Sequence, residues 1–212
     1  PLAAYSGPLL AARRAAAKLG GVRTAHFTYL ASRGPLYLAQ EPHYRDADLP
    51  AEALSGGEAA MFSGYGVVAI EACCGSRIGT VSATMASGFY PAYRAARMED
   101  LAHLVVSLDN GAQATITVGR TPHPGAARIE LELFGPNGDF RWSQAHDGAP
   151  QPDGIDAFID DLVAAAQTGR APYLGAAEVL STVAVLGAAY RSAAVGEPVA
   201  VPDLLGEAGE GS

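Results

Sequence analysis

Residues 57–74, GEAAMFSGYGVVAIEACC, are almost entirely apolar or small; they begin at the second glycine of the pair Gly56-Gly57 and end before Gly75. Such composition is typical of a helix that is buried around most of its circumference. Tyr65 stands alone among small residues near the middle of this run. The sequence therefore predicts a buried helix that begins at a glycine pair and carries a single tyrosine.

Alternating runs and turn residues predict the rest of the fold. Asn110-Gly111 between two alternating runs is a strong hairpin signal, and GPNG at 135–138 marks a second hairpin. We expect strands at 22–32, 79–89, 101–108, 112–118, 128–134 and 139–143, and helices at 8–19, 57–74, 155–167 and about 175–195. These elements predict an α+β fold in which a mostly antiparallel open sheet has helices packed on one face.

The other face of this sheet is predicted to be only partly polar. It mixes residues such as Val105 with His103, Glu130 and Glu132. Such a face suits a subunit interface, so we expect a homo-oligomer that forms through it, although the face could equally be solvated. Residues 33–54 contain three prolines and no periodicity, which predicts a long surface loop of the kind that is often functional.

Composition limits the possible partners. A chain of 212 residues can bury the core of one domain, and a net charge of −8 argues against binding to nucleic acid or an acidic membrane surface. No stretch is long and apolar enough to predict a membrane span. The two cysteines, Cys73 and Cys74, are adjacent and have neither metal-ligand nor disulfide spacing, which fits a reducing cytoplasm.

The helix at 57–74 resembles the second-domain helix of the Gfo/Idh/MocA oxidoreductases, the family of glucose-fructose oxidoreductase and inositol dehydrogenase. That helix has the form G-G-x-x-x-x-D-x-G-x-H-x-x-D-x-x-x-x-x-x-G. With one residue fewer after the glycine pair than in this pattern, Gly56, Gly57 and Gly75 match it, whereas Met61, Ser63, Tyr65 and Val68 replace its first Asp, inner Gly, His and second Asp. The branch that resembles glucose-fructose oxidoreductase and dihydrodiol dehydrogenase carries Tyr at the position of the His.

Later segments are similar to further motifs of this family, in the same order. They are EDLAHLVVSLDNGAQATITVGR, IELELFGPNGDFRW and the closing region from FIDDLVAAAQTG onwards. The resemblance implies that residues 1–21 are a linking helix from a missing nucleotide-binding domain and that 22–205 are the C-terminal substrate and oligomerisation domain. Residues 206–212 are predicted to be a flexible tail. Because the chain begins at Pro1 with residues that resemble the middle of a protein, we expect an excerpt.

The resemblance also implies an activity. The family transfers a hydride between NAD or NADP and a sugar, a polyol or a related hydroxyl or carbonyl compound, and the cofactor would be bound mainly by the missing domain. Gly64-x-Gly66-x-x-Ala69 formally matches a dinucleotide motif, but it lies inside a helix and follows no strand. Lys18 lacks the Glu and Pro that flank the family's catalytic lysine, and we interpret it as a solvated residue near the C-terminal end of a helix.

Five residues are candidates for the site. The resemblance assigns Tyr65 to proton transfer with the substrate, while the residues alone would favour a phenol that fills a core gap. His43 and Arg45 in the long loop, and Arg120 and His123 after a strand, could bind a small polar substrate or could be solvated. No metal site is expected. The alternative function is a non-catalytic family member that acts as a binding or assembly partner, which the loss of Asp at the position of Met61 favours.

Overall fold

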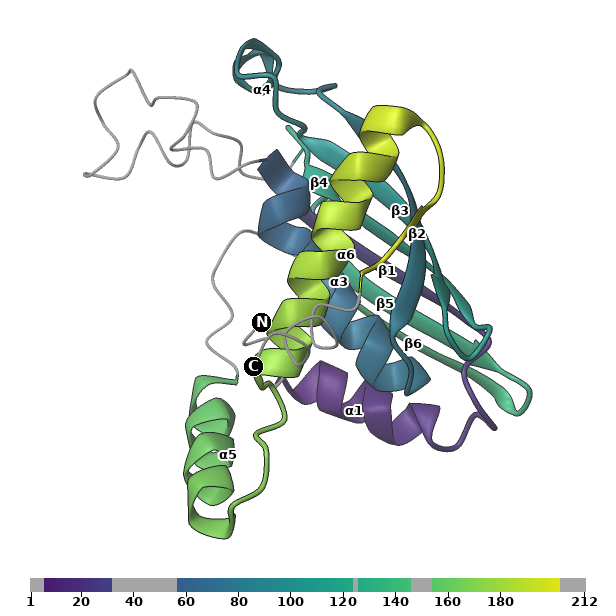
Figure 1. Cartoon of the computed structure of the whole chain (residues 1–212), viewed down its shortest axis with the longest axis vertical. Helices are drawn as coiled ribbons and strands as arrows, with labels where there is room; N and C mark the ends of the chain where they lie inside the picture. The colour runs from purple at the N-terminus through teal and green to yellow at the C-terminus, as the bar shows by residue number, and fades with distance from the viewer. Residues whose placement is uncertain (1–5, 32–56, 124–125, 146–153, 203–212) are drawn as a thin grey trace.

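The computed structural model describes residues 6–31, 57–123, 126–145 and 154–202, which form a seven-stranded sheet with helices beside it (Figure 1). The strands are β1 (Thr24–Ala31), β2 (Ile78–Ala86), β3 (Leu101–Leu108), β4 (Gln113–Arg120), β5 (Arg128–Gly135), β6 (Gly138–Ala145) and β7 (Val199–Ala200). Their order is β6-β5-β1-β4-β3-β2-β7. β1 and β4 run parallel, and the other neighbours run antiparallel. The predicted α+β fold is therefore confirmed.

The helices are α1 (Gly7–Ala16), α3 (Gly57–Cys74), α4 (Pro91–Ala95), α5 (Ile155–Thr168) and α6 (Ala176–Val195). Four of them, and six of the strands, lie close to the predicted bounds. The short helix α4 and the two-residue strand β7 were not predicted, because neither is long enough to show a hydrophobic period.

Both predicted hairpins are present. β3 and β4 are joined around Gly111, which has a φ of +83°, and the side chain of Asn110 accepts the N–H of Ala112 at 3.1 Å. The Asn110 amide also donates to the carbonyl of Cys74 at 3.0 Å, so this turn is fastened to the end of α3. β5 and β6 are joined through Gly135 and Gly138, which pair with one another.

The helix α3 packs directly on the centre of the sheet. Gly66 makes this close approach possible, because a Cβ at this position would lie only 2.7 Å from the ring of Phe27 on β1 and 2.8 Å from Ile116 on β4. Both of these side chains are buried. The two inner glycines of α3 therefore lie within the helix, and Gly66 serves the packing of helix on sheet, as expected for a glycine at a close backbone approach.

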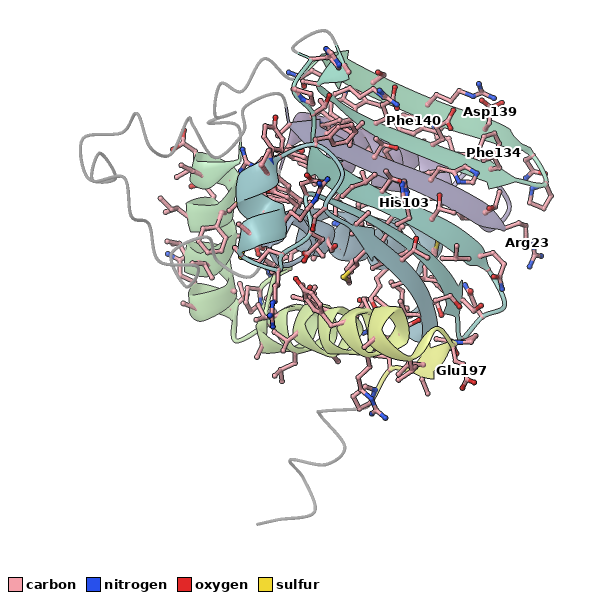
Figure 2. All side chains as sticks on the ribbon, turned by 90° about the horizontal axis from the view of Figure 1, so that it is seen from above. Arg23, His103, Phe134, Asp139, Phe140 and Glu197 are labelled. Carbon is pink, nitrogen blue, oxygen red and sulfur yellow. The ribbon has the colours of Figure 1, made fainter. Side chains whose placement is uncertain are left out.

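On the face of the sheet that points away from α3, the central strands carry mainly hydroxyl and imidazole side chains. His26 Nδ1 lies 2.8 Å from Thr115 Oγ1, and His103 Nδ1 lies 3.1 Å from Thr117 Oγ1. Figure 2 shows His103 on the sheet with α6 lying along one side of it. Val105, which is 53% exposed, is an apolar exception on this face. The expected alternation between an apolar face and a partly polar one is thus present in the structure.

The helix α5 stands away from the sheet in Figure 1. Among its residues only Ala165 is buried. Four of its large apolar residues, Ile155, Ile159, Leu162 and Val163, are exposed, whereas Phe158 is partly buried. Asp161 holds the helix to the following segment, since its carboxylate pairs with Arg170 at 2.5 Å and accepts the N–H of Tyr173 at 2.7 Å.

Candidate functional site

Tyr65 lies near the middle of α3 and is half-buried. Its ring stacks on Tyr29 of β1, with the ring centroids 5.6 Å apart and the planes 17° from parallel. Tyr29 also stacks on Phe62, at 4.3 Å and 16°. Because Phe62 and Tyr65 are three residues apart, they lie on one face of the helix, and the ring of Tyr29 contacts both.

The phenol of Tyr29 stays protonated over the physiological range. Burial, followed by the negative charge that an ionised Tyr65 would carry, raises the pKa of Tyr29 to about 12. The positive charge of Arg120 opposes this rise, and the negative charge of Glu58 adds to it. These four side chains are therefore close enough to influence one another electrostatically.

Arg120 and Glu58 form a buried ion pair beside this stack. Arg120 is the last residue of β4 and Glu58 lies in the first turn of α3. The Nε of Arg120 donates to Oε1 of Glu58 at 2.6 Å, and the side chains are only 8% and 1% exposed. The hydroxyl of Tyr93 donates to the same oxygen. Within the part of the chain that the structure describes, Oε2 of Glu58 has no hydrogen-bond partner.

Two further contacts fix the guanidinium of Arg120. Its Nη2 lies 3.2 Å from the Sδ of Met61, and its Cζ lies 5.4 Å from the centre of the Phe62 ring. Arg120 therefore contacts three residues in the first two turns of α3. Burial lowers the pKa of Arg120, but the charge and hydrogen bonds of Glu58 more than compensate, so the guanidinium remains charged.

A second buried carboxylate caps the start of α3. Oε1 of Glu99 accepts the N–H of Ala59 at 3.0 Å and the hydroxyl of Tyr190 at 2.8 Å. Gly57 has a φ of +89°, and a Cβ there would overlap the Glu99 carboxylate. Gly57 is thus required both by its backbone conformation and by the space it leaves. Gly57, the second glycine of the pair, therefore has a structural function at the start of α3.

The neighbouring Asp100 is fully buried and organises the segment that carries Tyr93. Its carboxylate accepts the backbone N–H groups of Gly88, Phe89 and Tyr90 at 2.7–2.9 Å. The segment between β2 and β3 is tied to α3 by the side chain of Tyr93, which bonds Glu58, and by the backbone carbonyl of Glu99, which accepts the N–H of Glu58 at 3.2 Å.

The structure brings only some of the predicted site residues together. Tyr65 and Arg120 belong to one cluster, joined through Tyr29 and Phe62. His123 is exposed, three residues beyond Arg120, and its N–H donates to Thr121 Oγ1 at 3.2 Å. The alternative prediction that Arg120 is solvated is wrong. This residue is only 7% exposed, because it ends a central strand beneath α3.

His43 and Arg45 lie outside the described residues. Sequence reasoning missed Glu58, Glu99 and Tyr29. A signal existed for Glu58, because a carboxylate in an otherwise apolar helix requires a partner. Nothing in the local sequence identified Arg120 as that partner, since the two residues are 62 positions apart.

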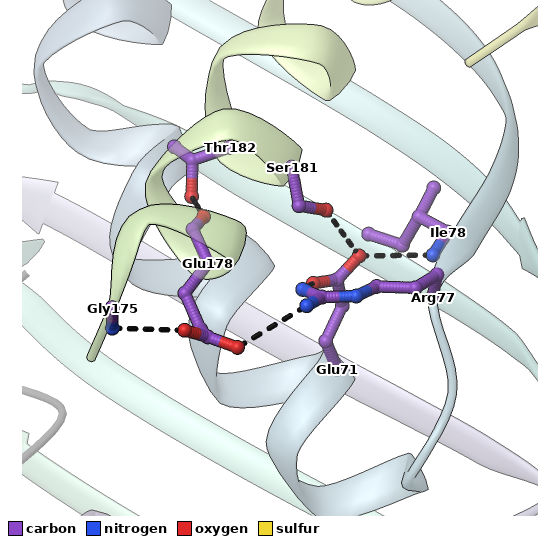
Figure 3. A network of polar contacts seen from close by, with 7 residues as sticks. All are labelled: Glu71, Arg77, Ile78, Gly175, Glu178, Ser181 and Thr182. Carbon is purple, nitrogen blue, oxygen red and sulfur yellow. Dashed lines mark hydrogen bonds and ion pairs between the residues drawn. The ribbon is translucent and has the colours of Figure 1, made fainter. Parts of the chain in front are cut away.

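A separate polar network lies at the other end of α3 (Figure 3). Glu71 accepts hydrogen bonds from Arg77 at 2.7 Å and from Ser181 at 2.8 Å, and Arg77 also bonds Glu178 at 3.1 Å. A cavity of about 260 Å³ adjoins this network and is also lined by Tyr173. Because the charged groups already pair with one another, we interpret the network as a clamp between α3, β2 and α6.

The described residues do not fit a nucleotide cradle. The glycines of the formal dinucleotide motif, Gly64 and Gly66, lie inside α3. Side chains from the sheet fill the space next to Gly66, so no phosphate can approach it there. A pyrophosphate site needs instead a glycine turn that leads from a strand into a helix. Among the described helices, none is long and apolar enough to cross a membrane. The same residues contain no cluster of three metal-binding side chains.

Comparison with known proteins agrees with the fold. A putative myo-inositol dehydrogenase from Sinorhizobium meliloti has a TM-score of 0.76 at 17% identity, covering 95% of this chain and 64% of its own. Scyllo-inositol dehydrogenase from Lactobacillus casei, solved with NAD(H) and scyllo-inositol, has a TM-score of 0.73 at 16% identity, covering 94% and 63%. The WlbA dehydrogenase from Bordetella pertussis, solved with NADH and UDP-GlcNAcA, has 0.72 at 18%, covering 94% and 62%.

The chain thus spans rather less than two thirds of the length of these solved structures. No curated protein sequence matches it significantly. The model of the GFO/IDH/MocA C-terminal domain matches residues 10–141, which are more than half of the chain. The predicted resemblance is therefore confirmed, and the chain belongs to the GFO/IDH/MocA family.

Proposed function

We propose that this chain is the substrate-binding and oligomerisation domain of an NAD(P)-dependent oxidoreductase that acts on a sugar, a polyol or a related hydroxyl or carbonyl compound. Family membership and the fold shared with sugar and polyol dehydrogenases support this proposal. In the proposed division, residues 1–21 link the domain to a nucleotide-binding unit, 22–205 form the domain itself and 206–212 are a tail. A cytoplasmic location, which the two buried free thiols suit, is part of the same proposal.

The observation that carries the proposal is the position of Tyr65. In the motif resemblance it corresponds to the family's proton-transferring His, and it presents a half-buried phenol on a helix that is packed against the sheet. A nicotinamide cofactor, when bound, would supply or accept the hydride. The chain's own contribution is the proton: the Tyr65 hydroxyl gives it to the substrate oxygen in reduction and takes it back in oxidation.

The other site residues are proposed to bind the substrate. His123 is exposed beyond the end of β4, where it can donate to or accept from a substrate hydroxyl. His43 and Arg45 keep the same proposed role. Arg120, whose Nε is held by Glu58, keeps the proposed role of a substrate contact beside Tyr65.

We propose that the open face of the sheet forms the subunit interface. Its apolar residue Val105 and its ordered His–Thr pairs present a regular surface rather than mobile long side chains. Glu130 on this face is paired with Arg128 at 2.8 Å, so its charge is already compensated before a second subunit packs against it. The alternative is a solvated face, and the mass of the protein in solution distinguishes it from an interface.

The test of the catalytic role is Tyr65→Phe in the complete oxidoreductase. Loss of the hydroxyl should lower kcat by on the order of 10²-fold, because the general-acid contribution disappears while the ring and its stacking remain. Tyr173→Phe is the matched control, since it removes a tyrosine hydroxyl from the residues that line the cavity at the other end of α3. Unchanged kcat in Tyr65→Phe, with a deuteride isotope effect showing that hydride transfer limits the rate, would make Tyr65 a core residue.

One observation favours the alternative of a non-catalytic binding or assembly partner. Where the family often has Asp, this chain has Met61, and its thioether contacts Arg120. The polar group that would contact a polyol is thus replaced by a side chain that serves internal packing. Hydride transfer by the complete protein, abolished by Tyr65→Phe, would eliminate this alternative.

A further inference from the structure

We propose that Tyr29 is a positioning residue, which holds the phenol of Tyr65 in one orientation as the middle member of a stacked aromatic column. The inference rests on the proposed role of Tyr65 in proton transfer, but its geometric part is testable without catalysis. Tyr29 belongs to β1 and Tyr65 to α3, so the contact joins the sheet to the helix.

The column consists of three nearly parallel rings. Tyr29 lies between Phe62, at 4.3 Å, and Tyr65, at 5.6 Å, and both interplanar angles are below 20°. These separations are those of offset-stacked aromatic pairs. A tilt of the Tyr65 ring about its Cβ–Cγ bond, or a change of its χ1 rotamer, would therefore break its contact with Tyr29.

The end of the column away from Tyr65 is also anchored. The guanidinium of Arg120 lies 5.4 Å from the centre of Phe62, and Arg120 is held by Glu58. One residue beyond Tyr65, Gly66 fixes the distance between α3 and the sheet. The backbone that carries Tyr65 and the ring it packs on are thus both immobilised, as a proton-transferring group requires, since a misplacement of about 1 Å can cost 10²-fold in rate.

The chemistry of Tyr29 suits positioning rather than proton transfer. With a pKa raised to about 12, its hydroxyl stays protonated while Tyr65 exchanges a proton, so Tyr29 does not compete for that proton. The stacking contact needs the ring and not the hydroxyl. Phenylalanine should therefore replace Tyr29 in this function, whereas leucine, which has similar hydrophobicity but no flat face, should not.

The test places 3-fluorotyrosine at position 65 alone in the 212-residue chain and records its ¹⁹F NMR signal. In the parent chain and in Tyr29→Phe, we expect one sharp signal displaced from its unfolded position by the ring current of residue 29. In Tyr29→Leu, the signal should broaden and move most of the way towards the unfolded position. Phe140→Leu on β6 is the control, because it removes another partly buried core aromatic far along the sheet.

Three results would overturn the inference: a signal that stays sharp in Tyr29→Leu, equal broadening in Tyr29→Leu and Phe140→Leu, or equal broadening in Tyr29→Phe and Tyr29→Leu. In the complete enzyme, Tyr29→Leu should lower kcat by on the order of 10²-fold with little change in KM, and Tyr29→Phe should restore kcat. If Tyr65→Phe keeps its kcat while Tyr29→Leu still broadens the ¹⁹F signal, the positioning holds and the proposed proton transfer fails. If Tyr65→Phe abolishes kcat while Tyr29→Leu preserves it, the positioning inference fails alone.

Discussion

Replacing Arg120 by methionine should destabilise the protein, and more strongly at about pH 8 than at about pH 5. The substitution keeps much of the side-chain volume but removes the cation that pairs with Glu58, whose side chain is 1% exposed. Removal of one partner from a buried ion pair costs about 3–5 kcal/mol, because the other charge stays buried without compensation. Among the described side chains, only that of Tyr93 would then still donate a hydrogen bond to the Glu58 carboxylate.

The pH dependence follows from the pKa of Glu58. Burial raises this pKa above its ordinary value, and Arg120 opposes the rise. Without Arg120 the folded-state pKa rises further, while the unfolded value stays ordinary. Above the unfolded value the folded variant therefore binds more protons than the unfolded chain, and its stability falls as the pH rises through the folded pKa. Each added unit of difference between the folded and unfolded pKa of Glu58 increases the loss of unfolding free energy at high pH by about 1.4 kcal/mol.

Urea unfolding monitored by the fluorescence of Trp142, the single tryptophan, measures this effect. The control is Arg141→Met, which breaks exposed pairs with Asp139 and Glu132 and should cost no more than about 1 kcal/mol at either pH. The double variant Glu58→Gln/Arg120→Met should recover part of the loss and show less pH dependence. A loss below about 1 kcal/mol for Arg120→Met, or an equal loss at both pH values, would refute the reasoning.

The other predictions concern the cofactor, the helix packing and the assembly. Residues 1–212 alone should not bind NADH at micromolar concentration, because the glycines of the formal dinucleotide motif lie inside α3; fluorescence titration that showed such binding would contradict this assignment. Gly66→Ala should cost about 1–3 kcal/mol in urea unfolding through overpacking against β1 and β4, whereas Gly187→Ala, with open space around it, should be neutral or stabilising. Sedimentation should show a dimer or larger that charge reversal of Glu130 and Glu132 weakens, and a monomer in both forms would disprove the sheet-face interface.

The sequence by itself determined the elements and the fold class. Apolar composition between glycines predicted α3 at 57–74, and alternating runs with turn residues between them predicted both hairpins; these are local signals. The element α4 and the strand β7 lacked any such signal, since β7 is two residues long and exists through its pairing with Thr80 and Val81. The motif order also predicted the family that the comparison confirmed.

Tertiary structure alone decided which residues form the cluster around Tyr65 and Arg120. The parallel pairing of β1 with β4 places Tyr29 and Arg120 beside the same helix, and no local pattern encodes that pairing. Arg120 was consequently predicted to be either a substrate contact or solvated, whereas it lies buried against Glu58. Periodicity specifies which face of an element is apolar, but burying a charge requires a partner from another element. That partner is chosen only when the strands and helices pack together.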